Sequence, residues 1–176
     1  GVVEGFAPDR LVMEGDTVAG GWGEIGVIAT PGHMANHLSF AWRGALFSGD
    51  MVMGWSTSIV APPDGSMIDY MASLERLEQR PEQLYFSGHG PEIPEGPRYV
   101  RFLARHRRAR EASILHRLGK GEADIPTMVR AIYIGLDPRL ANAAGYSVLA
   151  HLEDLVARGV VATDGDPVIG GTYRMV

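Results

Sequence analysis

Apolar and polar positions alternate between residues 10 and 60, and this pattern predicts a β-rich segment. Residues 22–29 form a predicted strand that ends at the turn Thr30-Pro31-Gly32. Residues 37–42 and 45–48 follow as two further strands around an Arg43-Gly44 hairpin turn. Positions 51–66 are rich in Gly and Pro, which predicts a loop.

From residue 67 onward, the spacing of apolar residues changes from that of a strand to that of a helix. Residues 67–80 carry apolar side chains three or four positions apart, with Ser66 as the N-cap and Pro81 as the stop. A short strand over residues 83–86 should lead into the turn Ser87-Gly-His-Gly90. Strands followed by a covering helix indicate a mixed α/β module.

A long helix is predicted from Pro97 to about Leu118. One sector of this helix is apolar, and Arg101, Arg105 and Arg108 point away from it. Arg107 and Glu111 fall on the apolar side, four residues apart. They can pair with each other, so we expect them at a packed junction rather than in water.

The C-terminal residues predict a winged helix. Helices are expected over residues 123–134 and 137–158, followed by a hairpin of 160–163 with 168–176. The apolar stripe of the last helix leaves a face that we expect to be exposed, formed by Ser147, His151, Asp154 and Arg158.

Charge divides the chain in the same way. Residues 1–97 have 13 acidic and 4 basic side chains, a formal charge of −9, whereas residues 98–176 have 8 acidic and 12 basic ones, a charge of +4. Six arginines fall between Arg98 and Arg110. Such a run favours either a solvated helix face or an anionic partner.

Composition narrows the class of protein. The sequence has 45% hydrophobic and 21% charged residues, as soluble globular domains do. It has no apolar stretch near the roughly 18 residues of a membrane span and no signal segment, so we expect a cytoplasmic protein that binds no membrane. Since it begins with Gly1, we expect a piece of a longer chain, a processed terminus or an engineered boundary.

Three turns that follow predicted strands each carry a potential metal ligand. These are His33 after Thr30-Pro-Gly, Asp50 after Ser48-Gly, and His89 after Ser87-Gly. The sequence has no Cys, so any transition metal must be held by His and carboxylates. Two imidazoles and a carboxylate suit Zn, Mn or Fe.

These segments resemble a known family. The motifs at residues 30–37, 47–50 and 87–91 resemble the last three metal-binding motifs of the metallo-β-lactamase superfamily, and residues 69–74 and 106–115 resemble its members with a C-terminal winged helix, including an endoribonuclease branch. The resemblance implies an α/β (α+β) fold. Residues 1–110 would be the C-terminal half of an αβ/βα sandwich, and residues 111–176 a small winged-helix domain.

The resemblance also implies roles for the three residues. His33 would bind a first metal, His89 a second, and Asp50 would bridge both and act in catalysis, with zinc as the expected metal. The family's remaining ligands come from a His-x-His-x-Asp-His motif, and this sequence has no such motif. We therefore expect the chain alone to bind metal weakly or not at all and to be inactive. His37 has no direct ligand role in the family, which leaves a structural or supporting role.

The implied function is a metal-dependent hydrolase in which metal-activated hydroxide attacks an ester-type or phosphodiester bond. The arginine run and winged helix favour single-stranded RNA as substrate. The metal motifs favour a small ester or a thioester of the glyoxalase II type, although glyoxalase II lacks a winged helix. Two alternatives stay open, a non-catalytic fragment and a winged-helix module that binds nucleic acid.

Half of a two-sheet sandwich should leave one sheet face uncovered. Exposed apolar area of that size favours association. We therefore expect the missing N-terminal half of the same protein as a partner, or a homo-oligomer in its place.

Overall fold

The computed structural model describes Gly5 and residues 7–176, and it contains two modules joined by one long helix. The first module is a five-stranded sheet in the order β1-β2-β3-β4-β5. Its strands are β1 (Thr17–Gly20), β2 (Gly23–Ala29), β3 (Leu38–Trp42), β4 (Ala45–Gly49) and β5 (Leu84–Ser87). Neighbouring strands are antiparallel except β4 and β5, which are parallel.

Two helices cover one face of this sheet. Helix α1 (Met67–Glu78) and helix α2 (Gly96–Leu118) pack against each other and on the sheet. Their shared core takes Ile28, Leu46 and Tyr85 from the strands, Leu74 from α1 and Leu103 from α2. Ser66 caps α1 by accepting a hydrogen bond from the Asp69 backbone N–H at 3.2 Å, as the sequence predicted.

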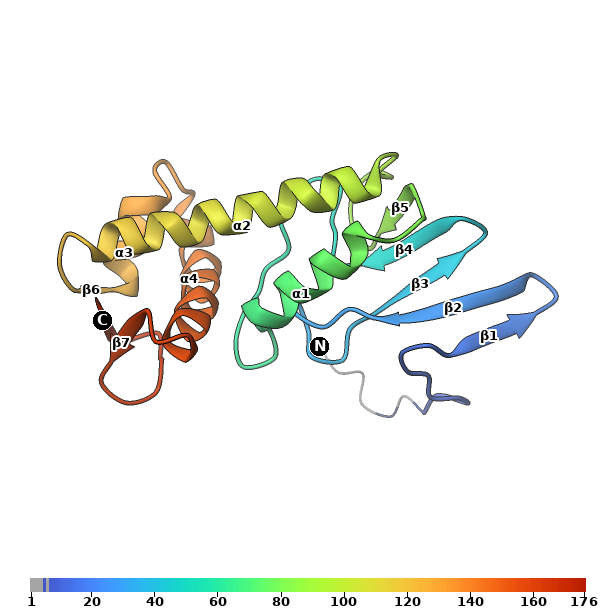
Figure 1. Cartoon of the computed structure of the whole chain (residues 1–176), viewed down its shortest axis with the longest axis horizontal. Coiled ribbons are helices and arrows are strands. Elements are labelled where there is room, and N and C mark those ends of the chain that lie inside the picture. Colours follow the sequence, from blue (N-terminus) through green and yellow to red (C-terminus); the bar gives the residue numbers. More distant parts are fainter. Residues whose placement is uncertain (1–4, 6) are drawn as a thin grey trace.

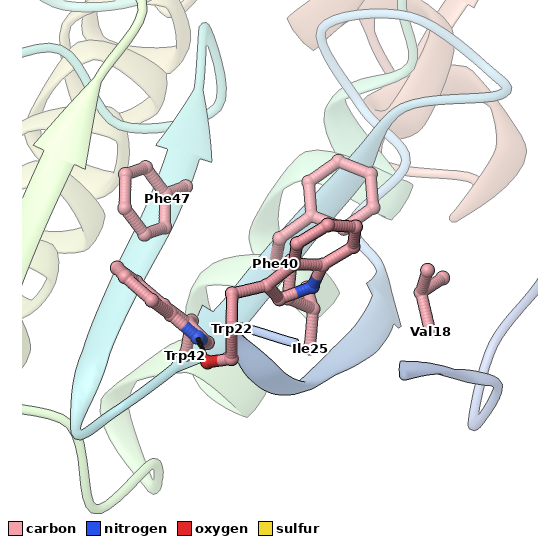
Figure 2. A pocket seen from close by; sticks show the side chains of 6 residues that line it. All are labelled: Val18, Trp22, Ile25, Phe40, Trp42 and Phe47. Atoms are coloured by element: carbon pink, nitrogen blue, oxygen red, sulfur yellow. Dashed lines mark hydrogen bonds between the residues drawn. The ribbon is translucent and has the colours of Figure 1, made fainter. Parts of the chain in front are cut away.

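The opposite face of the sheet is apolar and uncovered among the described residues. Figure 2 shows the side chains gathered there, which we call the open face. Phe47, with 38% of its surface exposed, stacks on Phe86 at 5.3 Å between ring centroids. The open face is formed by Val18, Trp22, Ile25, Phe40, Trp42 and Phe47. Apolar residues on both faces of a sheet are typical of a sheet buried on both sides.

The second module is a winged helix. It contains β6 (Ala123–Asp124), α3 (Ile125–Ile132), a 3-10 turn η1 (Pro138–Leu140), α4 (Ala141–Ala157), β7 (Val161–Thr163) and β8 (Thr172–Met175). The strands form a sheet in the order β6-β8-β7. Helix α3 begins two residues later than predicted, because Asp124 pairs with β8 and accepts a cap bond from the Thr127 N–H.

Helix α2 belongs to both modules. Its first half contributes Val100 and Leu103 to the core under the sheet, and its last turns contribute Ile114 and Leu118 to the core of the winged helix. Figure 1 shows α2 running from the sheet to the C-terminal helices. The predicted division at residues 110 and 111 thus falls within a continuous helix, between the two cores, and stays a prediction. None of the described helices has the length and apolar character needed to cross a bilayer.

Two predictions about the helices were wrong. Ser147 and His151 are buried rather than exposed, because α4 packs against the winged-helix core on one side and against α1 on the other. Arg107 does lie at a packed junction, with 3% of its surface exposed, but it does not pair with Glu111. Glu111 binds Arg158 of α4 at 2.8 Å instead, a partner that the spacing along one helix does not reveal.

Candidate metal centre

Three turns at one edge of the sheet bring His33, Asp50 and His89 together, and we call this group the Asp50 cluster. The Asp50 Oδ2 atom lies 4.0 Å from His33 Nε2, and its Oδ1 atom lies 3.6 Å from His89 Nε2. Each carboxylate oxygen therefore faces a different imidazole. This is the arrangement expected of a carboxylate shared between two positions.

Parallel pairing of β4 and β5 explains why Asp50 meets His89. Gly49 and Ser87 are partners in the register, and the Gly88 N–H donates to the Gly49 carbonyl at 2.8 Å. A β-carbon at position 88 would overlap the Asp50 carboxylate, so any residue other than glycine would displace this side chain. The residues after both strands consequently emerge side by side.

The turn that carries His33 also depends on a glycine. Gly32 has a φ of 137°, which is unfavourable for other residues, and a β-carbon there would overlap the backbone of Tyr70 in α1. The Ser73 hydroxyl donates to the Pro31 carbonyl at 2.7 Å and fastens the same turn to α1. Helix α1 thereby fixes the position of His33.

Hydrogen bonding selects the tautomer of His33. Its Nδ1 lies 2.6 Å from the Ile59 carbonyl, which can only accept, so Nδ1 carries the proton in the neutral ring. The Nε2 lone pair is then free and faces Asp50. A backbone carbonyl on the second ring nitrogen is the usual way in which proteins orient a metal-binding imidazole.

His37 supports the cluster from behind. Its Nδ1 lies 2.9 Å from the Thr30 hydroxyl, and its Nε2 accepts from the backbone N–H of Asp50 at 3.3 Å. Burial lowers the pKa of His37, and the neighbouring His33 lowers it further. A neutral His37 that holds the Asp50 turn favours the supporting role that the sequence left open.

Comparisons with known proteins agree with this fold. Residues 125–171 match a β-lactamase associated winged helix domain. The "Beta-lactamase-like protein 2 homolog" of Drosophila melanogaster is 32% identical over 139 residues, which are 77% of this chain and 46% of the relative. This chain belongs to the metallo-β-lactamase superfamily. It is a member with a C-terminal winged helix, and it spans about half the length of the β-lactamase-like relatives that it matches.

Two further matches extend the comparison. The hydroxyacylglutathione hydrolase of Rhodospirillum rubrum is 43% identical over 84 residues, covering 46% of this chain and 32% of that protein. A β-lactamase domain protein from Burkholderia ambifaria has a similar fold, with a TM-score of 0.85 at 24% identity. The match covers 97% of this chain and 54% of the Burkholderia chain.

The donors of the Asp50 cluster fit part of a two-metal site of this superfamily. Imidazole nitrogen and carboxylate oxygen are the ligands that zinc and iron accept. Each position next to Asp50 would have one imidazole and one carboxylate oxygen. Across Gly5 and residues 7–176, no group of three or more His, Asp or Glu is arranged to hold one ion. A catalytic zinc normally has three protein ligands, so both positions are incomplete.

Sequence reasoning missed the supports of the cluster rather than its members. The Ile59 carbonyl orients His33, and the Ser58 hydroxyl donates to the Asp50 carbonyl at 2.6 Å. Both lie in the loop over residues 51–66, where Gly and Pro predicted only irregular structure. A backbone carbonyl leaves no mark in the sequence, so His33 and Ile59 could not have been paired beforehand.

Proposed function

We propose that this chain supplies half of a two-metal hydrolytic centre, with His33 on one metal, His89 on the other and Asp50 bridging them. The observation that carries the proposal is the opposed placement of the two imidazoles on the two oxygens of one carboxylate. A carboxylate that bridges two metals needs one further donor beside each of its oxygens, and the two imidazoles are placed in that way. An isolated surface carboxylate would need neither.

Divalent metal ions, when bound, supply Lewis acidity and make water a nucleophile near neutral pH. The residues of this chain set where that happens. Asp50 fixes the spacing of the two positions, because its two oxygens belong to one rigid group. His33 is held in the tautomer that leaves Nε2 free, and His89, 65% exposed, lies on the outer side of the cluster. The His89 side of the cluster is therefore accessible to further ligands.

A carboxylic ester or thioester is the substrate class that we favour. Three of the six arginines in the run are paired with carboxylates, since Arg98 binds Glu95, Arg101 binds Glu78 and Arg108 binds Glu75. These pairs lower the positive charge that RNA phosphates would meet. The similarity to the Rhodospirillum hydroxyacylglutathione hydrolase, a protein named for a thioester substrate, supports the same choice.

We also propose that a polypeptide with a His-x-His-x-Asp-His motif completes the centre and packs on the open face. The missing ligands and the uncovered apolar sheet call for the same kind of partner, the N-terminal half of such a fold. A second copy of this chain would cover the open face but would bring no such motif.

The test compares the chain alone with the chain mixed with such a polypeptide. Titration calorimetry with zinc chloride should give weak binding for the chain and at least 100-fold tighter binding for the mixture, since each ion then gains its further ligands. The mixture should hydrolyse an acyl-glutathione thioester faster than an RNA oligonucleotide. Hydrolysis of RNA that weakens steeply with salt would instead favour the endonuclease alternative.

Substitution of the bridging carboxylate provides the control. Asp50→Asn should remove tight zinc binding by the mixture. Asp69→Asn, at an exposed carboxylate in the first turn of α1, should leave it unchanged. Equal zinc affinity of the Asp50→Asn variant and the wild type would contradict the proposal.

A further inference from the structure

Arg107 is a buried cation whose contacts lead in two directions. Only 3% of its surface is exposed, and it has no carboxylate within ion-pair distance among the described residues. Its Nη1 donates to the Ser147 hydroxyl at 3.0 Å, its Nη2 donates to the Ser58 carbonyl, and its guanidinium lies 5.2 Å from the centre of the Tyr70 ring. Burial of an unpaired cation costs stability, so a role beyond packing is expected.

One direction leads to the Asp50 cluster. The Ser58 hydroxyl donates to the Asp50 carbonyl at 2.6 Å and lies 3.1 Å from the Met51 carbonyl. The Tyr70 hydroxyl donates to the Met51 carbonyl at 3.3 Å. Both residues that Arg107 contacts in the sheet module therefore hold the backbone at Asp50 and Met51.

The other direction leads to the winged helix. Ser147 lies on α4, buried between the two modules, and its neighbour Ala150 packs in the core under the sheet. In a winged helix that binds DNA, this last helix enters the groove. Here α4 is covered by the sheet module on the face that carries Ser147 and His151. The wing offers Asp164, whose carboxylate is paired with Arg174 at 3.1 Å.

We infer that Arg107 is a positioning residue that ties α4 of the winged helix to the backbone carrying Asp50. The winged helix then stabilises the position of the turn that carries Asp50, rather than binding nucleic acid. The contacts stand independently of metal, whereas the benefit for catalysis rests on the proposed function of Asp50.

Hydrogen exchange on the chain without metal tests this inference. The amide of Met51 donates to the Ser48 carbonyl at 3.1 Å and that of Asp50 donates to His37, so both amides report on the turn. Arg107→Lys keeps the positive charge but loses the simultaneous hydrogen bonds to Ser58 and Ser147. This substitution should speed exchange of both amides about tenfold, since hydrogen bonds to charged groups are strong. Arg108→Lys, exposed on the same helix, is the matched control and should change neither amide.

Ser147→Ala keeps the test decisive if Arg107→Lys fails to fold. It removes one acceptor on the winged helix, far in sequence from Asp50, and should speed exchange at Asp50 and Met51 about threefold, since a neutral partner contributes less. Unchanged exchange in Ser147→Ala, together with a lower melting temperature, would mean that the contact only stabilises the junction and would overturn the inference. Failure of the completed centre to bind zinc would overturn the proposed function and leave these exchange results standing.

Discussion

Acid should destabilise the junction between α4 and α2 through His151. This residue is 1% exposed, and neither ring nitrogen has a hydrogen-bond partner among the described residues. Burial, and then the positive charges of Arg107, Arg110, His106 and Arg158, lower the pKa of His151 to about 3. The largest effects on this pKa all lower it, so the folded protein keeps His151 neutral.

The direction and size of this pH effect follow from the difference between the pKa of His151 in the folded state and in the unfolded state. The pKa of His151 is about 3 in the folded state and 6.5 for a free side chain, so the unfolded state binds the proton first. Stability is therefore complete above pH 6.5 and falls as the pH drops toward 3. Between pH 6.5 and 4.5, the free energy of unfolding should fall by about 2 kcal/mol from this group alone.

Urea unfolding at pH 6.5 and pH 4.5, followed by circular dichroism, measures this loss. His151→Leu should be at least as stable as the wild type at pH 6.5, since no hydrogen bond is lost, and should lose about 2 kcal/mol less on acidification. His116→Leu, at an exposed histidine of α2, should keep the acid sensitivity of the wild type. If His151→Leu loses stability with acid as steeply as the wild type, the buried neutral histidine is not the cause.

Three further predictions concern the sheet and its turns. Phe47→Glu should shift the isolated chain from self-associated species to monomer in size-exclusion chromatography, because it charges the open face; a monomeric wild type would contradict this. Gly32→Ala should lower the free energy of unfolding in urea by about 1–3 kcal/mol, since φ is 137° and the new methyl group meets Tyr70. Gly88→Ala should displace the Asp50 carboxylate and alter the imidazole proton shifts of His89 in NMR spectra, with little change in melting temperature.

The order of elements was predictable, because Gly and Pro mark the turns and the apolar period separates strand from helix. Predictions failed where a helix is buried on two sides. The stripe of α4 that contains Val148 and Leu152 correctly identified its contact with the winged-helix core. The second contact of α4 is made through the polar residues Ser147 and His151. The apolar pattern therefore predicted that these two residues would be exposed. The partner of Arg107 was missed for the same reason, since it lies on another element.

The candidate site shows the same limit in a different form. His33, Asp50 and His89 were singled out because each follows a strand on a Gly turn and matches a family motif. Their mutual distances come from the parallel pairing of β4 with β5 and from the docking of the Gly32 turn on α1. Neither follows from the residues alone, because strand order depends on contacts that are distant in the chain.

Under the proposed function, a single further layer would cover the open face and also complete the metal positions. Within this chain, hydrogen bonds from neighbouring protein groups orient the Asp50 cluster. The Ile59 carbonyl sets His33, His37 holds the Asp50 backbone, and the Ser58 hydroxyl closes the turn. Ligands that are held in advance need little reorganisation when an ion arrives. To hold a metal tightly, the cluster needs further metal-ligating side chains. A sheet that packs on the open face supplies these side chains only if its own sequence contains them. Burial of the open face and completion of the centre are therefore expected to occur in the same step, and a partner that satisfies one without the other is the wrong partner.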